Sequence, residues 1–300
     1  MASLDTTKVT LPVEVTTAVA SRLHDNSVVA SFSPADALTG YHNDAYNYFT
    51  GGARAEVVGE ATAENAYDTA GKPVPGKLFK VHTTTRVTDE LSWADADDQL
   101  AIIEAIQNDQ ASAVAEALDY VILHAVNPLD GAALAGYTAL TSGATAVTDG
   151  GDAAADIDAI VDAIPDYDIT GIALSRPFAG KLRALRGASG ARLYPEIPLS
   201  LNAGTLEGVP AVTSANVAGK LAATATNVLA IAGDWTTVRW RIARPLTASI
   251  IAYGDPDGAG DLQRYGQVAY RTECVFSYAV LDPKRLAVLK AKTTGSKSTK

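Results

Sequence analysis

One uninterrupted helical pattern, from Asp95 to Asn127, constrains the fold more than any other feature of the sequence. The segment contains neither glycine nor proline, and Pro128 follows its end. At 1.5 Å per residue such a helix is about 45 Å long, more than twice the usual length, so we predict a structural spine. Apolar residues recur along it at three- and four-residue spacing, as on a helix with one buried face: Leu100, Ile103, Ile106, Val114, Ala117, Leu118, Val121 and Ala125.

Two other segments alternate in polarity with the period of a β-strand. From Lys77 to Thr88, apolar and threonine side chains share one face, and charged side chains such as Arg86 lie on the other. From Val268 to Val280 the alternation places Arg271 and Glu273 opposite the apolar face. The second run predicts a strand longer than the usual upper limit.

A strand from Ala53 to Gly59 is predicted to pair with Lys77–Thr88 as a long hairpin. An isolated ribbon with so few large apolar residues is marginally stable in water. It therefore needs a surface to dock on, which could be its own domain or another molecule. Its tip would contain four turn-forming residues: Gly71, Pro73, Pro75 and Gly76.

Residues 149–235 are predicted to form an α/β unit. Asp152–Ile164 has the pattern of an acidic amphipathic helix, and Ile169–Leu174 that of a short buried strand. Ser175 is suited to cap a second helix, with Pro177 in its first turn.

The end of the chain returns to strands. Val238–Ile242 alternates, with Arg239 and Arg241 on its polar face. Asp282–Pro283 is predicted to cap a short helix that runs through Leu289. The Thr/Ser/Lys tail is expected to be disordered.

Composition limits the classes of protein that fit this chain. Three hundred residues, 47% hydrophobic and 19% charged, are ordinary for a folded protein of about two domains. No apolar stretch approaches the roughly 20 residues of a bilayer span, and the N-terminus lacks a secretion signal. The single cysteine, Cys274, fits a reducing compartment. The net charge of −10 repels polyanions, so we do not expect a surface that grips nucleic acid.

No arrangement of residues predicts catalysis, a cofactor or a metal. Motifs for a phosphate loop, a nucleophile elbow and a zinc protease are absent, and the four histidines lie in unrelated segments. Residues 255–261 lack acidic residues that a calcium loop needs and are predicted to form a tight turn. The pair Arg239 and Arg241, with Arg244 beyond it, has two interpretations: a solvated strand face, or pairing with carboxylates of a neighbouring molecule.

Short motifs follow one another in order over nearly the whole chain, and their order and spacing resemble one family. They are Leu11-Pro12-Val13-Glu14, Asn26-Ser27-Val28-Val29, Val57-Val58-Gly59-Glu60, Thr85-Arg86-Val87-Thr88-Asp89-Glu90-Leu91, His124-Ala125-Val126-Asn127-Pro128, Thr205-Leu206-Glu207-Gly208-Val209-Pro210-Ala211-Val212, Gly233-Asp234-Trp235, Val268-Ala269-Tyr270-Arg271-Thr272-Glu273 and Asp282-Pro283. The family is that of the HK97-fold major capsid proteins of tailed bacteriophages, in particular those that infect actinobacteria.

The resemblance implies an α+β, HK97-like fold with named parts. These are an N-arm (1–40), an E-loop hairpin region (41–92), a P-domain in two parts (93–148 and 236–292) that joins the spine helix to long strands, an A-domain (149–235) and a flexible tail (293–300). It also implies a structural subunit, not an enzyme, that assembles into hexamers and pentamers of an icosahedral shell around double-stranded DNA in the virion.

The expected partners follow from the same resemblance. They are further copies of the chain, a portal, a decoration protein and packaged DNA bound without sequence specificity. Because the sequence shows no long helical N-terminal extension, a separate scaffolding protein is also expected, unless the N-arm itself suffices for assembly. Assembly in the host bacterial cytoplasm is expected, with no membrane. An encapsulin-like compartment shares the fold and remains an alternative, and a soluble α/β hydrolase is the alternative from another class.

Charged residues on the hairpin and on the polar strand faces are the candidates for contacts between subunits. We predict no catalytic, cofactor-binding or metal-binding residue. The contact candidates are Glu56, Glu60, Lys77, Lys80, Arg86, Arg239, Arg241, Arg244, Arg271 and Glu273.

Overall fold

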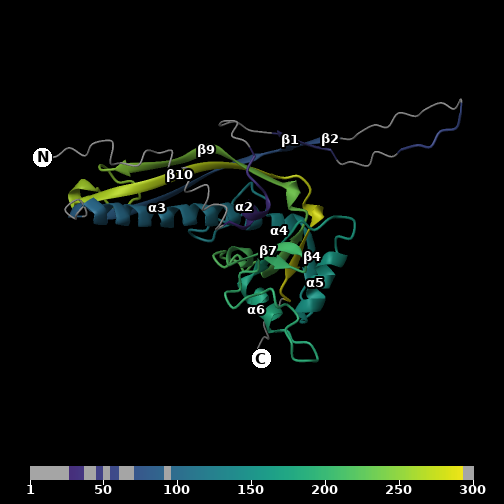
Figure 1. The fold of residues 1–300 in the computed structure, drawn as a ribbon. Helices are drawn as coiled ribbons and strands as arrows, with labels where there is room; N and C mark the ends of the chain where they lie inside the picture. Colours follow the sequence, from purple (N-terminus) through teal and green to yellow (C-terminus); the bar gives the residue numbers. More distant parts are fainter. Residues whose placement is uncertain (1–26, 37–44, 50–54, 61–70, 91–95, 293–300) are drawn as a thin grey trace, which may run out of the picture.

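A long helix lies along a three-stranded sheet and forms the extended arm of the molecule (Figure 1). The structure is a computed structural model that describes residues 27–36, 45–49, 55–60, 71–90 and 96–292. Helix α3, Ala96–Asp119, continues as one π-helical segment, η2, Tyr120–His124, and ends where Ala125 adopts a left-handed backbone with φ 51°. The predicted spine is therefore confirmed over residues 96–124, and Asp95 lies outside the described residues.

The sheet against α3 has the strand order β3-β10-β9. Strand β10, Gln267–Val280, pairs antiparallel with β3, Lys77–Thr88, from Gln267 opposite Thr88 to Tyr278 opposite Lys77. Strand β9, Val238–Ile251, pairs antiparallel with the other edge of β10. Both long strands predicted from alternation are confirmed.

The predicted hairpin partner of Lys77–Thr88 was wrong. Residues 55–59 form no strand, and β3 instead pairs with β10 along its length. The two-stranded ribbon is made by β1, Ala45–Phe49, and β2, Gly71–Pro75, and it projects away from the body (Figure 1). Gly76 separates β2 from β3, so the turn-forming residues mark the passage from ribbon to sheet and not the tip.

A six-stranded mixed sheet forms the second part of the body, in the order β4-β11-β8-β5-β7-β6. Helices α5, Ala153–Asp162, and α6, Arg176–Ala184, pack beside each other on this sheet, as predicted for an α/β unit. Its strands are β4, Thr145–Thr148, β5, Gly171–Ser175, β6, Thr205–Leu206, β7, Val209–Ser214, β8, Val228–Gly233, and β11, Leu286–Lys290.

The predicted C-terminal helix through Leu289 was also wrong. Asp282 does cap a helical turn, since its side chain accepts a hydrogen bond from the Lys284 amide, but this turn is a single 3-10 segment, η6, Pro283–Arg285. Residues 286–289 are fully buried and lie between β8 and β4. A central strand buries both faces of such an apolar run, whereas a helix at the surface would bury only one.

Short elements complete the described chain. They are α2, Val28–Phe32, α4, Leu140–Gly143, and the 3-10 segments η3, Asn216–Ala218, η4, Trp235–Thr237, and η5, Gln263–Tyr265. No helix among the described residues is long and apolar enough to cross a membrane.

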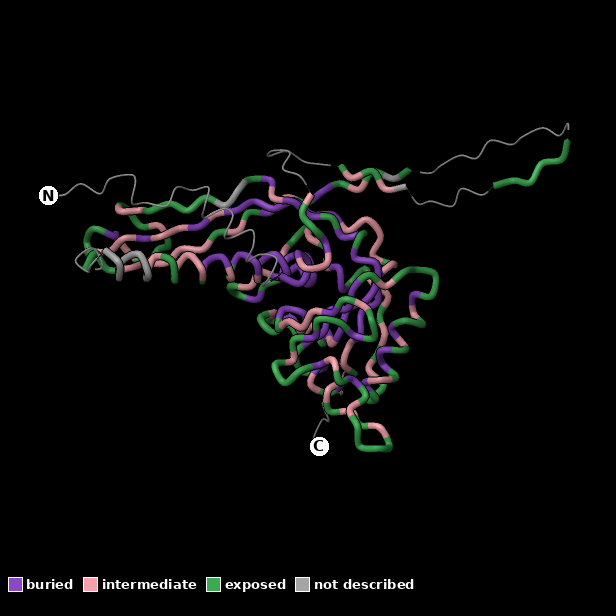
Figure 2. The backbone as a smooth tube through the Cα atoms, in the orientation of Figure 1, coloured by how far each residue is buried: buried purple, intermediate pink, exposed green. Residues whose placement is uncertain are grey.

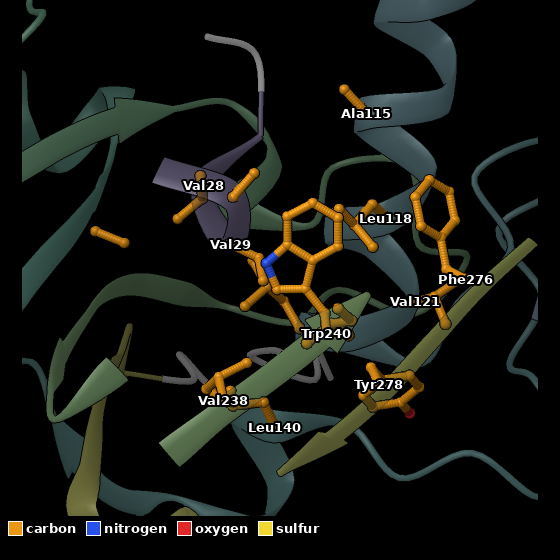
Figure 3. Close-up of a cluster of buried hydrophobic side chains, with 14 of the residues drawn as sticks. Val28, Val29, Ala115, Leu118, Val121, Leu140, Val238, Trp240, Phe276 and Tyr278 are labelled. Carbon is orange, nitrogen blue, oxygen red and sulfur yellow. The ribbon is translucent and has the colours of Figure 1, made fainter. Parts of the chain in front are cut away.

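The main core lies where the C-terminal half of α3 meets the sheet and α2 (Figures 2 and 3). Trp240 of β9 lies at its centre, 4% exposed, and its indole Nε1 donates to the Ser33 carbonyl at 2.6 Å. A second cluster joins α5 and α6 to one face of the six-stranded sheet. The ribbon contributes to neither core cluster, and its described residues are exposed or half-buried.

A buried carboxylate fastens the N-terminal segment to the spine. Asp119 is fully buried in the last turn of α3 and accepts hydrogen bonds from the Ser27 hydroxyl at 2.6 Å and from the Val28 and Val29 amides at 3.0 and 3.2 Å. The Asn216 side-chain amide donates to it at 2.8 Å. Burial raises the pKa of Asp119, and these four hydrogen bonds oppose that shift. The carboxylate therefore joins three segments that are distant in sequence.

Candidate subunit-contact residues

The face of the β3-β10-β9 sheet that points away from α3 carries most of the predicted contact residues. Strand register places these residues on the same face, because the side chains of directly paired residues share a face of the sheet. Glu273 lies opposite His82, Val275 opposite Lys80, and Ser277 opposite Arg241. The alternation read from the sequence thus assigned these strand residues to the correct face.

Lys80 and Glu273 pair with each other on this face. Lys80 Nζ lies 3.0 Å from Glu273 Oε1. The hydrogen bond from Lys80 lowers the pKa of Glu273, with a smaller contribution from the charge of Arg271. Since the Lys80 side chain is about half exposed, this ion pair adds little to stability.

Arg86 organises the connection between β9 and β10. Its guanidinium donates to two carboxylates of this connection, Asp255 at 3.0 Å and Asp257 at 2.8 Å, and to the Gly260 carbonyl at 2.9 Å. Arg271 donates to the Pro256 carbonyl of the same connection at 2.7 Å. Residues 255–261 do connect two strands, as predicted, but they belong to a longer connection, residues 252–266, that includes η5, and not to a tight turn. The guanidinium of Arg86 lies among the oxygen atoms of this connection.

We predict that Arg86→Gln raises the pKa of Asp257 from about 2 towards its ordinary value near 4. Hydrogen bonding to Arg86 is the main cause of the low value, so its loss removes the preference for the charged carboxylate. The stabilisation from this pair is present above about pH 4 and is lost as the pH falls through about 2. A carbon-13 NMR titration of aspartate carboxyls would measure the shift. Arg239→Gln is the control, and an unchanged Asp257 titration in Arg86→Gln would contradict the prediction.

Arg239 and Arg241 face the N-terminal segment of their own chain. Arg239 Nε donates to Asp36 Oδ2 at 3.0 Å, and the Asp36 amide donates to the Trp240 carbonyl at 2.9 Å. Arg241 is 3% exposed, and this burial lowers its pKa, against the opposing charge of Asp36. A solvated strand face therefore does not describe Arg241, and contact of either arginine with a neighbouring molecule stays a prediction.

The remaining candidates are exposed and lie apart from one another. Lys77 begins β3, and Arg244 is on β9, where its charge slightly lowers the pKa of Glu273. Glu56 and Glu60 belong to residues 55–60, a segment that lies beyond the ribbon (Figure 1), and both are exposed, as is Val57 at 99%. The structure thus brings Lys80, Arg86, Arg271 and Glu273 onto one surface but leaves these two glutamates distant from it.

The sequence reasoning missed Arg285, which connects the base of the ribbon to the body. Its guanidinium lies 5.8 Å from the ring centre of Tyr48 on β1 and 5.0 Å from that of Tyr167 after α5. It also pairs with Asp234 at 3.1 Å, and the Tyr48 hydroxyl donates to Asp282 at 3.3 Å. No local pattern marks such a residue, because its partners come from three separate segments.

No group of three histidine, cysteine or acidic residues among the described residues could hold a metal ion. Cys274 is buried, which raises the pKa of its thiol to about 12 and makes it inert, as expected of a small buried hydrophobe. His124 is buried at the end of η2, and desolvation lowers its pKa.

Comparisons with known proteins agree with this architecture. The model of the phage capsid family matches residues 7–291. A solved chain from Mycobacterium phage Ogopogo is 32% identical, with a TM-score of 0.75, and the match covers 89% of this chain and 92% of that chain. A chain from Gordonia phage Cozz is 26% identical, with a TM-score of 0.74 and coverage of 89% and 87%.

A more distant solved structure shares the fold alone. It is described as "Capsid of native GTA particle computed with C5 symmetry", is 14% identical and has a TM-score of 0.57, with coverage of 92% of this chain and 91% of that chain. No curated protein matches the chain. The first two likenesses confirm the predicted α+β, HK97-like fold.

Proposed function

Because this chain belongs to the phage capsid family and is a major capsid protein of the virion shell, we propose that its copies form hexamers and pentamers that close into an icosahedral shell around double-stranded DNA. The ribbon is the observation that carries this proposal. Strands β1 and β2 pair only with each other among the described strands, and residues 55–60 beyond them are exposed. The base of the ribbon contacts the body through Tyr48 and Arg285, so residues 55–60 are the part that needs a docking surface, and a neighbouring subunit supplies it.

The parts of the chain have separate roles in this proposal. Residues 1–40 act as the N-arm and 41–92 as the E-loop region. Residues 93–148 and 236–292 form the P-domain, 149–235 the A-domain, and 293–300 a C-terminal tail, which lies outside the described residues like most of the N-arm. Helix α3, β9 and β10 support this division, because they join the two P-domain segments in one arm; β3, which completes their sheet, comes from the E-loop region.

Further partners belong to the same proposal. They are a separate scaffolding protein, a portal and a decoration protein, with assembly in the host bacterial cytoplasm. The net charge of −10 supports a shell lining that weakly repels the phosphates of packaged DNA, so that DNA moves during packaging and ejection. DNA protected from nuclease inside purified particles separates this proposal from an encapsulin-like compartment. Neither that compartment nor a soluble hydrolase gains support from the comparisons.

We predict that Val57→Asp lowers the yield of closed shells at least tenfold. A charge at this exposed apolar position would have to be desolvated on docking, which opposes burial of residues 55–60. Sedimentation and negative-stain microscopy of the purified protein measure the yield.

Leu129→Asp is the matched control, since Leu129 is 92% exposed in a turn of the body. Shells that form equally well from Val57→Asp and from the unaltered chain would show that this segment does not dock. An unaltered chain that stays a compact monomer would contradict assembly itself.

A further inference from the structure

The charges of residues 149–195 are segregated along the chain. Residues 149–168 contain no lysine or arginine, and residues 169–195 contain no acidic residue. The acidic segment includes α5 and the loop after it, and the basic segment includes α6 and the loop after it. The acidic residues are Asp149, Asp152, Asp156, Asp158, Asp162, Asp166 and Asp168, and the basic ones are Arg176, Lys181, Arg183, Arg186 and Arg192.

Folding places the two helices beside each other on the six-stranded sheet, with α5 towards one end and α6 towards the other. Helix α5 packs over β4, β11 and β8, and α6 packs over β5, β7 and β8. The strand order β4-β11-β8-β5-β7-β6 therefore assigns α5 to the β4 end and α6 to the β7 end (Figure 1). We call these the acidic side, residues 149–168, and the basic side, residues 169–195.

The acidic side presents five of its seven carboxylates to solvent, while Asp149 is half-buried and Asp156 is buried. The buried face of α5 contains Ile157 and Ile160, and its opposite face exposes Asp158 and Asp162. Asp166 and Asp168 follow in an exposed loop. Asp158, Asp162, Asp166 and Asp168 have no ion-pair partner among the described residues, and like charges held together repel each other, so an oppositely charged surface gains free energy by approaching them.

On the basic side, one row of α6 carries arginines on the part of the helix opposite Lys181. Lys181 reaches towards the acidic side, with its Nζ 3.5 Å from Asp149 Oδ2, and this is the one ion pair that joins the two described segments. Arg176 and Arg183 are seven residues apart and share the opposite row of the helix. Arg183 Nε is buried and has no hydrogen-bond partner among the described residues.

A cleft adjoins this row. Arg176 lines it together with Asn202 and the end of β7, and its volume is about 520 Å³. The basic side is therefore hollowed beside its exposed cation. Two carboxylates adjoin each other nearby: Glu207 lies in the β6–β7 turn and Glu196 directly follows the basic side, and the Glu207 amide donates to the Glu196 carboxylate at 3.3 Å.

We propose that the acidic side of one copy packs against the basic side of the next copy, head to tail. The occupant of each surface is thus a second copy of this chain, and the inference rests on the proposed assembly into capsomers. Contact between two different surfaces of identical subunits closes into a ring when the rotation allows it. Complementary charges set the partner and the register of such a contact, and like charges oppose the inverted one.

Charge reversal tests this pairing. Asp158→Lys with Asp162→Lys makes the acidic side basic, and Arg176→Glu with Arg186→Glu makes the basic side acidic; all four residues are exposed. Each pair should raise the protein concentration needed for shell assembly at least tenfold, measured by light scattering and negative-stain microscopy. All four substitutions in one chain restore the net charge of −10 and should restore assembly.

Two further measurements keep the test decisive. Glu104→Lys with Asp109→Lys, on the exposed part of α3, changes the net charge as the acidic-side pair does and should assemble normally. An equal mixture of the two pair variants should recover only rings with an even number of copies, because opposite charges meet only when the variants alternate. Melting temperatures of the subunits show that each variant folds.

The outcomes separate the inference from the function on which it rests. If the unaltered chain forms shells and both pair variants assemble at the same concentration, the pairing is wrong and the assembly stands. The pairing is equally wrong if the folded fourfold variant assembles no better than either pair, or if the control fails to the same degree. If the unaltered chain forms no shell, the proposed function itself fails.

Discussion

Asp119→Ala is expected to lower the free energy of unfolding of the unassembled subunit by about 4 kcal/mol. The substitution removes the acceptor of four hydrogen bonds in a site that excludes water. Each buried donor left without a partner costs about 1–3 kcal/mol, and partial relaxation of the N-terminal segment reduces the total. Urea unfolding followed by circular dichroism measures the change.

The matched control is Asp109→Ala, on the exposed part of the same helix, which should change stability by less than about 0.5 kcal/mol. Asp119→Asn keeps one acceptor oxygen and should lie between the two. Limited proteolysis gives an independent measurement, because release of residues 27–33 from the spine should make cleavage there much faster. Equal stability of Asp119→Ala and Asp109→Ala would show that the buried carboxylate does not fasten this segment.

Trp240→Ala is expected to cost about 4 kcal/mol of stability, similar to other large-to-small changes in a packed core. Trp240 contacts the cluster formed by α2, α3 and β10, with its ring centre 6.2 Å from that of Phe276 (Figure 3). Its loss leaves a cavity and an unpaired Ser33 carbonyl. Thermal melting of the unassembled subunit would show a fall of several degrees.

Trp240→Phe separates the contribution of buried apolar area from that of the indole hydrogen bond. It keeps most of the apolar area but removes the indole donor, so it should cost about 1–2 kcal/mol. Tyr253→Ala, at a site 71% exposed, is the control for removal of a large aromatic ring and should have almost no effect. If Trp240→Ala were as mild as Tyr253→Ala, the cluster could not be the main core.

Elements whose signal is local were predicted well. The spine helix was predictable because its apolar period repeats over about seven turns without a helix breaker. Such a strong local preference for helix is not easily overridden by tertiary packing. Strand β10 was similarly clear, because alternation over Val268–Val280 leaves one buried face. The same alternation assigned Lys80, Arg86, Arg271 and Glu273 to the face away from the helix.

The errors concern which segments meet. Strand β3 pairs with β10, about 190 residues later in the chain, and no turn or spacing in the sequence indicates that partner. Residues 71–76 have turn-forming composition, and the nearest candidate strand was taken as the partner for that reason. Strand β11 was misread because a short apolar run fits either a helix or a buried strand until its neighbours are known.

The charged contact candidates were also predictable only in part. Their positions on strands were predictable, but Asp36, Asp255 and Asp257 became their partners only through folding. Asp119 is not among the apolar residues that mark the buried face of the spine helix, so nothing local predicts its burial. Its burial depends on Ser27 and Asn216, each more than 90 residues away.

The amino-acid sequence by itself determined the helices and strands with long periodic patterns, the faces of their charged residues and the family. Periodicity along a backbone is a local property, and the order of the motifs can be read from the sequence without knowing which residues contact each other. Only the tertiary structure decided the strand partners, the ribbon, the buried carboxylate and the two oppositely charged sides of the six-stranded sheet. Those features depend on contacts between segments that are distant in sequence. Such contacts form, and contribute their free energy, only when the whole chain folds around its cores.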